Sequence, residues 1–186
     1  MRKKKIYFFL DRDGTIIKHI NYLRRINDIK IYKNVFQSLK ILKQFGEIYV
    51  ITNQSAVARG FLSEKKLRNI NNFILNKINR RKKYIKKIFY CPHHINGKVQ
   101  KYKRNCIYRK PGIGFINRFK NIDKNNSWFI GDTYVDVETA KNSGINSALL
   151  LTGKKNKGNT NKIKPDMISK NILFASKKIK KCLLKV

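Results

Sequence analysis

The sequence contains few carboxylates. Its 186 residues include only ten Asp and Glu against 44 Lys and Arg, which gives a formal net charge of +34. The electrostatic field of so large a positive charge attracts anionic substrates, and repulsion between the positive charges weakens the fold at low salt. The basic residues run from Arg2 to Lys185, and Lys outnumbers Arg 33 to 11. Arg is the residue that usually reads bases and binds phosphates with two hydrogen bonds. The excess of Lys over Arg therefore indicates that the positive charge arose from drift in amino-acid composition and not from selection for a nucleic-acid-binding surface.

Cysteines and long apolar runs are also scarce. Three cysteines, an odd number in a chain of this length, do not make a disulfide framework. No apolar run approaches the length of a membrane span. Met1–Lys5 has the charge of the first region of a signal peptide, but the apolar run after it ends within about five residues, too few for the hydrophobic region. We therefore expect a cytoplasmic protein with no membrane partner.

The first pair of carboxylates directly follows an apolar run. Five apolar residues, Ile6–Leu10, are typical of a strand buried on both faces of a parallel sheet. Asp11 and Asp13 then lie just past its carboxyl end, where open α/β sheets bind ligands. In an extended chain, residues two apart point the same way. Two like charges so close require a cation between them, a shared proton, or surroundings that keep the two carboxyl groups in different protonation states for different roles.

Strand-like runs alternate with helical patterns through the chain. The sequence predicts strands at residues 6–10, 48–51, 85–90, 127–130, 145–151 and 167–168. It predicts helices over 35–45, from the N-cap Ser63 to 78, over 113–119, from 135 to Gly144 and over 172–184. We therefore expect one α/β domain (1–186), with a mainly parallel sheet flanked by helices. It would include a loop insertion at 91–108, and 154–186 would form a mobile loop and a C-terminal helix.

The acidic motifs resemble those of a known family. Asp11-Arg12-Asp13-Gly14-Thr15 resembles the first motif of the haloacid dehalogenase-like phosphatases, which have a Rossmann-like fold. Gly131-Asp132, again behind an apolar run, resembles the last motif. The resemblance implies that Asp11 is the nucleophile and forms an aspartyl-phosphate, and that Asp13 is the general acid and base. It also implies a Mg²⁺ site formed by Asp11, Asp132 and the backbone carbonyl of Asp13.

Three further residues complete the set that the resemblance implies. Thr52 follows the second strand at the place of the family's second motif. Lys110, before Pro111, stands at the place of the third, where an ammonium can neutralise both the nucleophile and the phosphoryl group. Asp136 would orient Lys110 or a water on the metal.

A longer run narrows the resemblance. Thr52–Gly60 is close to the run typical of the D-glycero-D-manno-heptose 1,7-bisphosphate 7-phosphatases, with Ala56 where that family usually has Gly. This implies a small sugar-phosphate substrate, which loses its 7-phosphate on the path to the heptose of lipopolysaccharide. The positions expected to bind substrate are His19, Asn21, Tyr22, Asn53, Gln54, Ser55, Arg109 and Lys110, with Arg59 in a supporting role.

The insertion has the residues of a zinc loop. Cys91, His93 and Cys106 have the soft-ligand character and spacing of such a loop. Tyr108 stands at the fourth ligand position of the family, and a phenol is a poor replacement for a thiolate. Three alternatives stay open: Zn²⁺ held by three ligands and water, a loop that has lost its metal, and plain core residues.

Other functions remain open from the sequence alone. Histidinol-phosphate phosphatases are similar over Thr52-Asn53-Gln54 only, and polynucleotide 3′-phosphatases carry a similar run and would suit the charge. A non-catalytic, basic nucleic-acid-binding remnant is the alternative outside enzymes. The intact set of motif residues argues against it, so we expect no nucleic-acid partner: Asp11, Asp13, Thr52, Lys110 and Asp132. A monomer is the default expectation.

Overall fold

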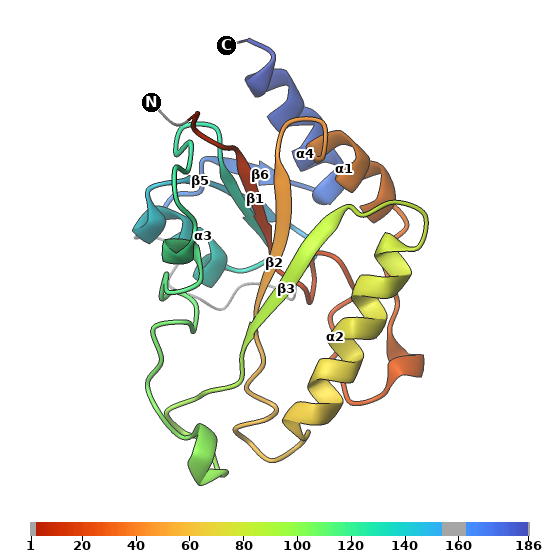
Figure 1. The fold of residues 1–186 in the computed structure, drawn as a ribbon, viewed down its shortest axis with the longest axis vertical. Helices are drawn as coiled ribbons and strands as arrows, with labels where there is room; N and C mark the ends of the chain where they lie inside the picture. The colour runs from red at the N-terminus through yellow and green to blue at the C-terminus, as the bar shows by residue number, and fades with distance from the viewer. Residues whose placement is uncertain (1–2, 154–162, 186) are drawn as a thin grey trace.

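The computed structural model describes residues 3–153 and 163–185. In these ranges six parallel strands form one sheet in the order β3-β2-β1-β4-β5-β6 (Figure 1). The strands are β1 (Tyr7–Leu10), β2 (Glu47–Asn53), β3 (Ile85–Cys91), β4 (Trp128–Gly131), β5 (Asn146–Leu150) and β6 (Met167–Ser169). The predicted α/β fold with a parallel sheet is confirmed.

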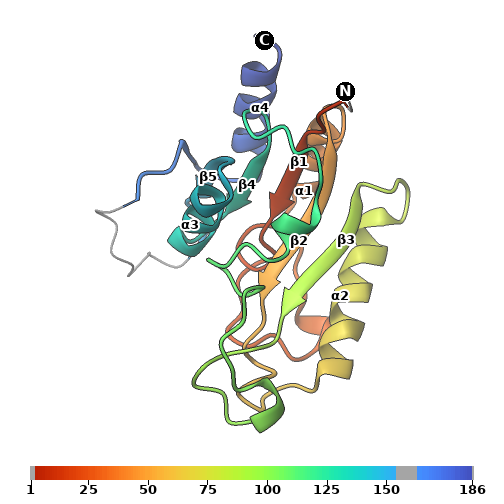
Figure 2. The same ribbon diagram turned by 60° about the vertical axis from the view of Figure 1, so that its left-hand side comes forward.

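Helices cover both faces of the sheet. They are α1 (Val35–Leu42), α2 (Glu64–Asn79), α3 (Tyr134–Ser143) and α4 (Ile172–Leu183). Figure 2 shows α1, α2 and α4 on one side and α3 on the other. In β1, Phe8 and Leu10 pack into the core on the side of α1, α2 and α4, whereas Tyr7 and Phe9 pack into the core on the α3 side. Alternation along a strand thus buries every residue of this run, as its continuous apolar character predicts.

Local signals set the helix ends where the sequence predicts them. Ser63 is the N-cap of α2, and its Oγ accepts a hydrogen bond from Lys66 N at 3.2 Å. Gly144 ends α3 with a left-handed φ of 67°. The predicted loop at 154–164 lies outside the described residues as far as 162.

The predicted helix over 113–119 is wrong. Only Ile116–Arg118 forms a short 3₁₀ turn. Gly114 N donates to the carbonyl of Ile107 at 2.9 Å, and this bond ties the segment back to the preceding loop. At Gly112, a Cβ would lie 2.4 Å from the same carbonyl oxygen. The segment is therefore held by close backbone contacts, which the apolar spacing of the sequence does not reveal.

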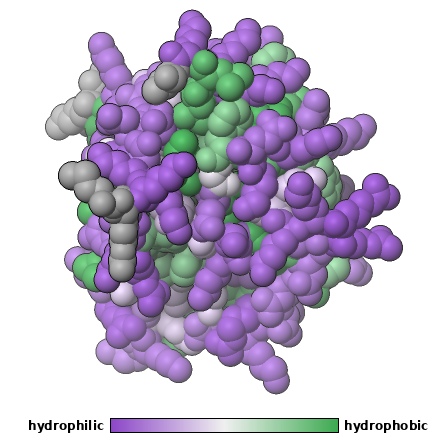
Figure 3. Space-filling model, turned by 45° about the horizontal axis from the view of Figure 1, so that its top comes forward, coloured by the Kyte–Doolittle hydropathy of each residue, from purple (hydrophilic) through white to green (hydrophobic). Residues whose placement is uncertain are grey.

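The basic residues lie almost entirely outside the core. Most of the face seen in Figure 3 is hydrophilic. Among the Lys and Arg of the described ranges, only Arg12 and Lys110 are buried. Both lie beside the acidic motifs, as shown below. No helix within the described part of the chain combines the length and apolar character needed to cross a bilayer.

Candidate active site

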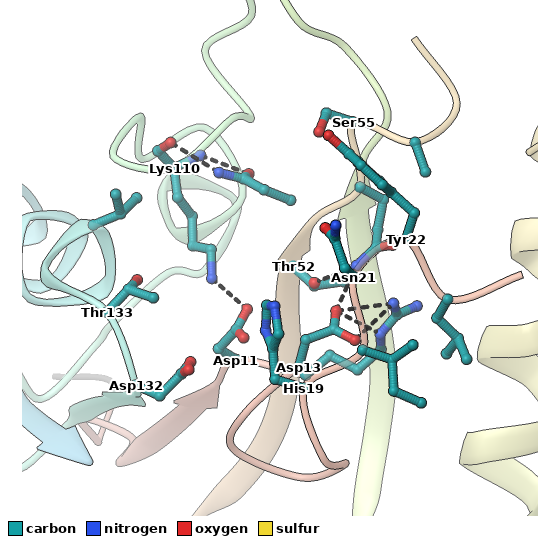
Figure 4. Close-up of a pocket in the computed structure, with 17 residues that line it drawn as sticks. Asp11, Asp13, His19, Asn21, Tyr22, Thr52, Ser55, Lys110, Asp132 and Thr133 are labelled. Atoms are coloured by element: carbon teal, nitrogen blue, oxygen red, sulfur yellow. Dashed lines mark hydrogen bonds and ion pairs between the residues drawn. The ribbon is translucent and has the colours of Figure 1, made fainter. Parts of the chain in front are cut away.

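A cavity of about 320 Å³ lies past the carboxyl ends of β1, β2 and β4. β1 is central, and the chain adds β2 on one side and β4 on the other, which is the switch point where open parallel sheets bind ligands. Motif residues from separate segments of the chain line the cavity (Figure 4): Asp11, Asp13, Thr52, Lys110 and Asp132. The fold thus gathers side chains that lie far apart in the sequence.

Lys110 joins two of the buried carboxylates. Its Nζ lies 2.5 Å from Asp11 Oδ1 and 2.5 Å from Asp136 Oδ1. Burial alone would lower the pKa of Lys110, but the charges of Asp11 and Asp136 and the hydrogen bonds to them raise it above its ordinary value. The other oxygen of Asp136 accepts from Thr133 N and Oγ1 at the start of α3. Asp136 is therefore engaged on both oxygens and holds Lys110 in place.

Three buried carboxylates lie close together at this site, two of them in the cavity wall. Oxygens of Asp11, Asp132 and Asp136 lie within 4.8 Å of one another. Burial raises the pKa of Asp11 to about 7, with the charge of Lys110 opposing the shift. Burial and then the charge of Asp11 raise the pKa of Asp132 to about 8. One ammonium does not offset three carboxylates, so the geometry favours a further cation.

The residues present fit Mg²⁺. This ion prefers carboxylate and carbonyl oxygens and retains several waters. Asp11 and Asp132 offer carboxylates at the cavity wall, whereas both oxygens of Asp136 already accept hydrogen bonds. At Gly14, φ is +82° and a Cβ would lie 2.0 Å from Asp132 Oδ2. Only glycine allows the first motif to approach Asp132 this closely.

Asp13 lies in a separate hydrogen-bonded group. Arg12 Nη2 is 2.9 Å and Arg12 Nε is 3.1 Å from Asp13 Oδ2. Gln54 Nε2 also donates to this oxygen at 2.8 Å, and to Thr52 Oγ1 at 2.9 Å. Asp13 is therefore held by donors, while Asp11 faces Lys110 and Asp132. The two neighbouring aspartates have different surroundings, as a division of labour requires.

Seven of the eight residues predicted to bind substrate line the cavity: His19, Asn21, Tyr22, Asn53, Gln54, Ser55 and Lys110. Asn53 also holds the backbone of Lys110, because its Nδ2 donates to Lys110 O and its Oδ1 accepts from Lys110 N, both at 3.0 Å. Arg109 does not line the cavity and donates to His93 O at 3.1 Å. Arg59 Nη2 lies 3.5 Å from His94 Nε2.

Arg12 and Asn71 have site contacts that the sequence analysis missed. Asn71 accepts from Arg12 Nη1 at 2.7 Å. One signal was present for each of them. Arg12 stands between two motif aspartates, and Asn71 is a polar residue within the apolar spacing of α2.

The cysteine–histidine loop brings three soft donors together. Ligand atoms of Cys91, His93 and Cys106 lie within 4.8 Å of one another. His94 does not add a fourth, because its Nδ1 accepts from Asn96 N at 3.0 Å and its Nε2 faces Arg59. The ring of Tyr108 packs on Phe115 with centroids 4.8 Å apart. Structural zinc sites normally use four protein ligands, so this set is one short.

Comparison with known proteins finds similar sequences among the heptose-1,7-bisphosphate 7-phosphatases. Residues 107–175 match the HAD-hydrolase-like protein family. A D-glycero-alpha-D-manno-heptose-1,7-bisphosphate 7-phosphatase of Photorhabdus laumondii is 35% identical over 147 residues, 77% of this chain and 80% of the relative. The D-glycero-beta-D-manno-heptose-1,7-bisphosphate 7-phosphatase of Escherichia coli is 31% identical over 159 residues and covers 83% of both chains.

Solved structures share the fold. The D,D-heptose 1.7-bisphosphate phosphatase from B. bronchiseptica, complexed with magnesium and phosphate, has a TM-score of 0.79 at 20% identity, over 97% of this chain and 99% of the other. A putative HAD-like phosphatase from Mesorhizobium loti has a TM-score of 0.80 at 20% identity, over 98% of this chain and 88% of the other.

Proposed function

Because this chain belongs to the heptose-1,7-bisphosphate 7-phosphatase family of haloacid dehalogenase-like hydrolases, we propose that it removes the 7-phosphate of D-glycero-D-manno-heptose 1,7-bisphosphate on the path to the heptose of lipopolysaccharide. It is a phosphoric monoester hydrolase. One observation carries the proposal for the site. Asp11 contacts Lys110 and lies within 4.8 Å of Asp132, in a cavity that Asp13 and Thr52 also line.

The two aspartates divide the chemistry. Asp11 attacks phosphorus in line with the leaving oxygen and forms an aspartyl-phosphate. Asp13, protonated, gives its proton to the leaving oxygen, and then takes a proton from the water that attacks the intermediate. Thr52 and Lys110 hold phosphoryl oxygens while charge redistributes.

Mg²⁺ would be held by Asp11, Asp132 and the carbonyl of Asp13. When bound, it supplies positive charge that offsets the repulsion between the nucleophile and the phosphate dianion. Lys110 contributes a second positive charge, which its contact with Asp136 keeps fixed beside Asp11. The amide of Asn21 and the hydroxyl of Ser55, which line the cavity and are not buried, support recognition of sugar hydroxyls.

The proposal is tested by phosphate release in the presence of Mg²⁺. The panel contains both anomers of the heptose 1,7-bisphosphate, fructose 1,6-bisphosphate, histidinol phosphate and an oligonucleotide with a 3′-phosphate. We expect one heptose anomer to have the highest kcat/KM. Preference for the oligonucleotide would overturn the proposal that the substrate is a heptose bisphosphate, and would give the net charge of +34 a function in nucleic-acid binding. No release from any compound would overturn catalysis itself.

For the cysteine–histidine loop we infer weak zinc binding that lacks one ligand. We expect Tyr108→Cys to increase the thermal stabilisation by Zn²⁺ above that of the unchanged protein, because it offers a thiolate at the family's fourth position. Zn²⁺ at about a hundredfold excess over its Kd would stabilise the variant by about 2.7 kcal/mol. Thermal melts with and without Zn²⁺ measure this. Tyr108→Ser removes the phenol without adding a ligand, and an equal gain in that control would contradict the inference.

A further inference from the structure

Arg12 has no part in the proposed chemistry, yet it is placed like a functional residue. Among the described Lys and Arg side chains, only it and Lys110 are buried, and Arg12 is 1% exposed. Both contact motif carboxylates, Lys110 at Asp11 and Arg12 at Asp13. A charge is costly to bury unless it is paired and hydrogen-bonded. In a chain whose other described basic residues reach the solvent, this one buried Arg calls for a reason beyond composition.

The guanidinium of Arg12 is fixed at both ends. On one side Nη1 donates to Asn71 Oδ1 at 2.7 Å. Asn71 is itself 4% exposed and projects from the apolar face of α2. On the other side Nε and Nη2 form a fork that faces Asp13. α2 thus holds the Arg12 side chain, and the Arg12 fork determines the orientation of the Asp13 carboxylate.

The two oxygens of Asp13 are not equivalent. Oδ2 accepts from Arg12 Nε at 3.1 Å, from Arg12 Nη2 at 2.9 Å and from Gln54 Nε2 at 2.8 Å. Within the described part of the chain, Oδ1 accepts only from Arg12 Nη2, at 3.1 Å. A carboxylate oxygen offers about two lone-pair positions. Three donors therefore saturate Oδ2, and a proton on Asp13 belongs on Oδ1.

We propose that Arg12 is a positioning residue: with Gln54 it holds Oδ2 of Asp13, so that Oδ1 carries the proton to the leaving oxygen. This rests on the proposed function, in which Asp13 is the general acid. As the bond between phosphorus and the leaving oxygen breaks, the Oδ1 proton passes to that oxygen and Asp13 becomes a carboxylate. The attacking water later returns a proton to Asp13. Asn71 supports the same arrangement by holding Arg12.

The dependence of rate on the leaving group tests this inference. A sugar alkoxide leaves poorly and needs the proton, whereas 4-nitrophenolate leaves without one. Because hydrolysis of the aspartyl-phosphate is common to both substrates, the single-turnover rate of leaving-group release is measured. We expect Arg12→Met to lower this rate for the sugar bisphosphate by about 10- to 100-fold, and for 4-nitrophenyl phosphate much less. Arg12→Lys keeps the charge without the fork and should shift the ratio of the two rates in the same direction. Arg12→Lys also provides the test if the Arg12→Met variant does not fold.

Two comparisons separate positioning from loss of structure. Ile74→Val, on the same face of α2 as Asn71, loosens packing without touching the hydrogen bonds, and should leave the ratio of rates unchanged. Asp13→Asn should shift the ratio most, and adding Arg12→Met to it should change the ratio no further, because Arg12 acts only through Asp13. Equal losses on both substrates in Arg12→Met and Arg12→Lys would overturn the inference. Failure of the proposed function is distinct, because the unchanged protein would then not hydrolyse the sugar bisphosphate.

Discussion

Replacing Asp11 with Asn is expected to abolish phosphate release, with a loss in kcat of about 10⁴-fold or more. The amide keeps the shape of the side chain but cannot attack phosphorus to form an acyl phosphate. Asn also removes a negative charge from beside Lys110 Nζ, which lies 2.5 Å from Asp11 Oδ1. Steady-state phosphate release with saturating Mg²⁺ measures the loss, and trapping of the phosphorylated enzyme after rapid acid quench shows whether the intermediate still forms.

The folded state should survive this substitution. Burial raises the pKa of Asp11 to about 7, so its charge is costly in the folded protein and a neutral side chain of the same shape is tolerated. Thermal melts without Mg²⁺ should therefore give Asp11→Asn a Tm equal to or above that of the unchanged protein. Asp28→Asn is the matched control, because Asp28 forms an ion pair with exposed Arg25 on the surface and should keep full activity. Turnover by Asp11→Asn would refute the nucleophile assignment, and the mechanism with it.

The sequence predicts the fold well because its strongest signals are local. Five apolar residues, Ile6–Leu10, precede Asp11, and the four that form β1 are buried on both faces of the strand. Ser63 begins α2 and Gly144 ends α3, both through contacts within a few residues. The segment 113–119 has equally clear apolar spacing, but it is held by the carbonyl of Ile107. Such a backbone contact depends on the path of the loop, which no spacing of side chains encodes.

The candidate site could be predicted as far as its motifs follow strands. Asp11 and Asp132 come directly after β1 and β4, and Thr52 lies near the carboxyl end of β2, so parallel topology alone places them at one edge. Arg109 could not be placed in this way, because it follows a long insertion, and its guanidinium contacts His93 O rather than the cavity. The role of Arg12 could not be predicted, because the sequence is so rich in basic residues that one more does not stand out. In a chain with 44 basic residues, only the structure shows which of them are buried.

Removing Mg²⁺ is expected to abolish turnover and to destabilise the protein more at high pH than at low pH. Burial raises the pKa of Asp11 to about 7, and burial with the charge of Asp11 raises that of Asp132 to about 8. An unfolded aspartate titrates at about 3.9. Between about pH 4 and about pH 8 the unfolded chain thus binds fewer protons at these groups than the folded chain, and their contribution to stability falls as pH rises.

Bound Mg²⁺ reverses this dependence, because its ligands must be deprotonated and its binding releases protons. Thermal melts with Mg²⁺ or with a chelator are compared at about pH 5.5 and about pH 8, at one ionic strength. They measure the pH dependence of stability without Mg²⁺ and the stabilisation that Mg²⁺ adds. The gain in Tm from Mg²⁺ should be larger at the higher pH. Asp132→Asn removes one of the two titrating carboxylates and should shrink both the gain and its pH dependence, whereas Asp28→Asn should change neither. An equal gain at both pH values would mean that the cation is not bound by the buried carboxylates. Retention of turnover after chelation would mean that Lys110 alone offsets the charge of Asp11.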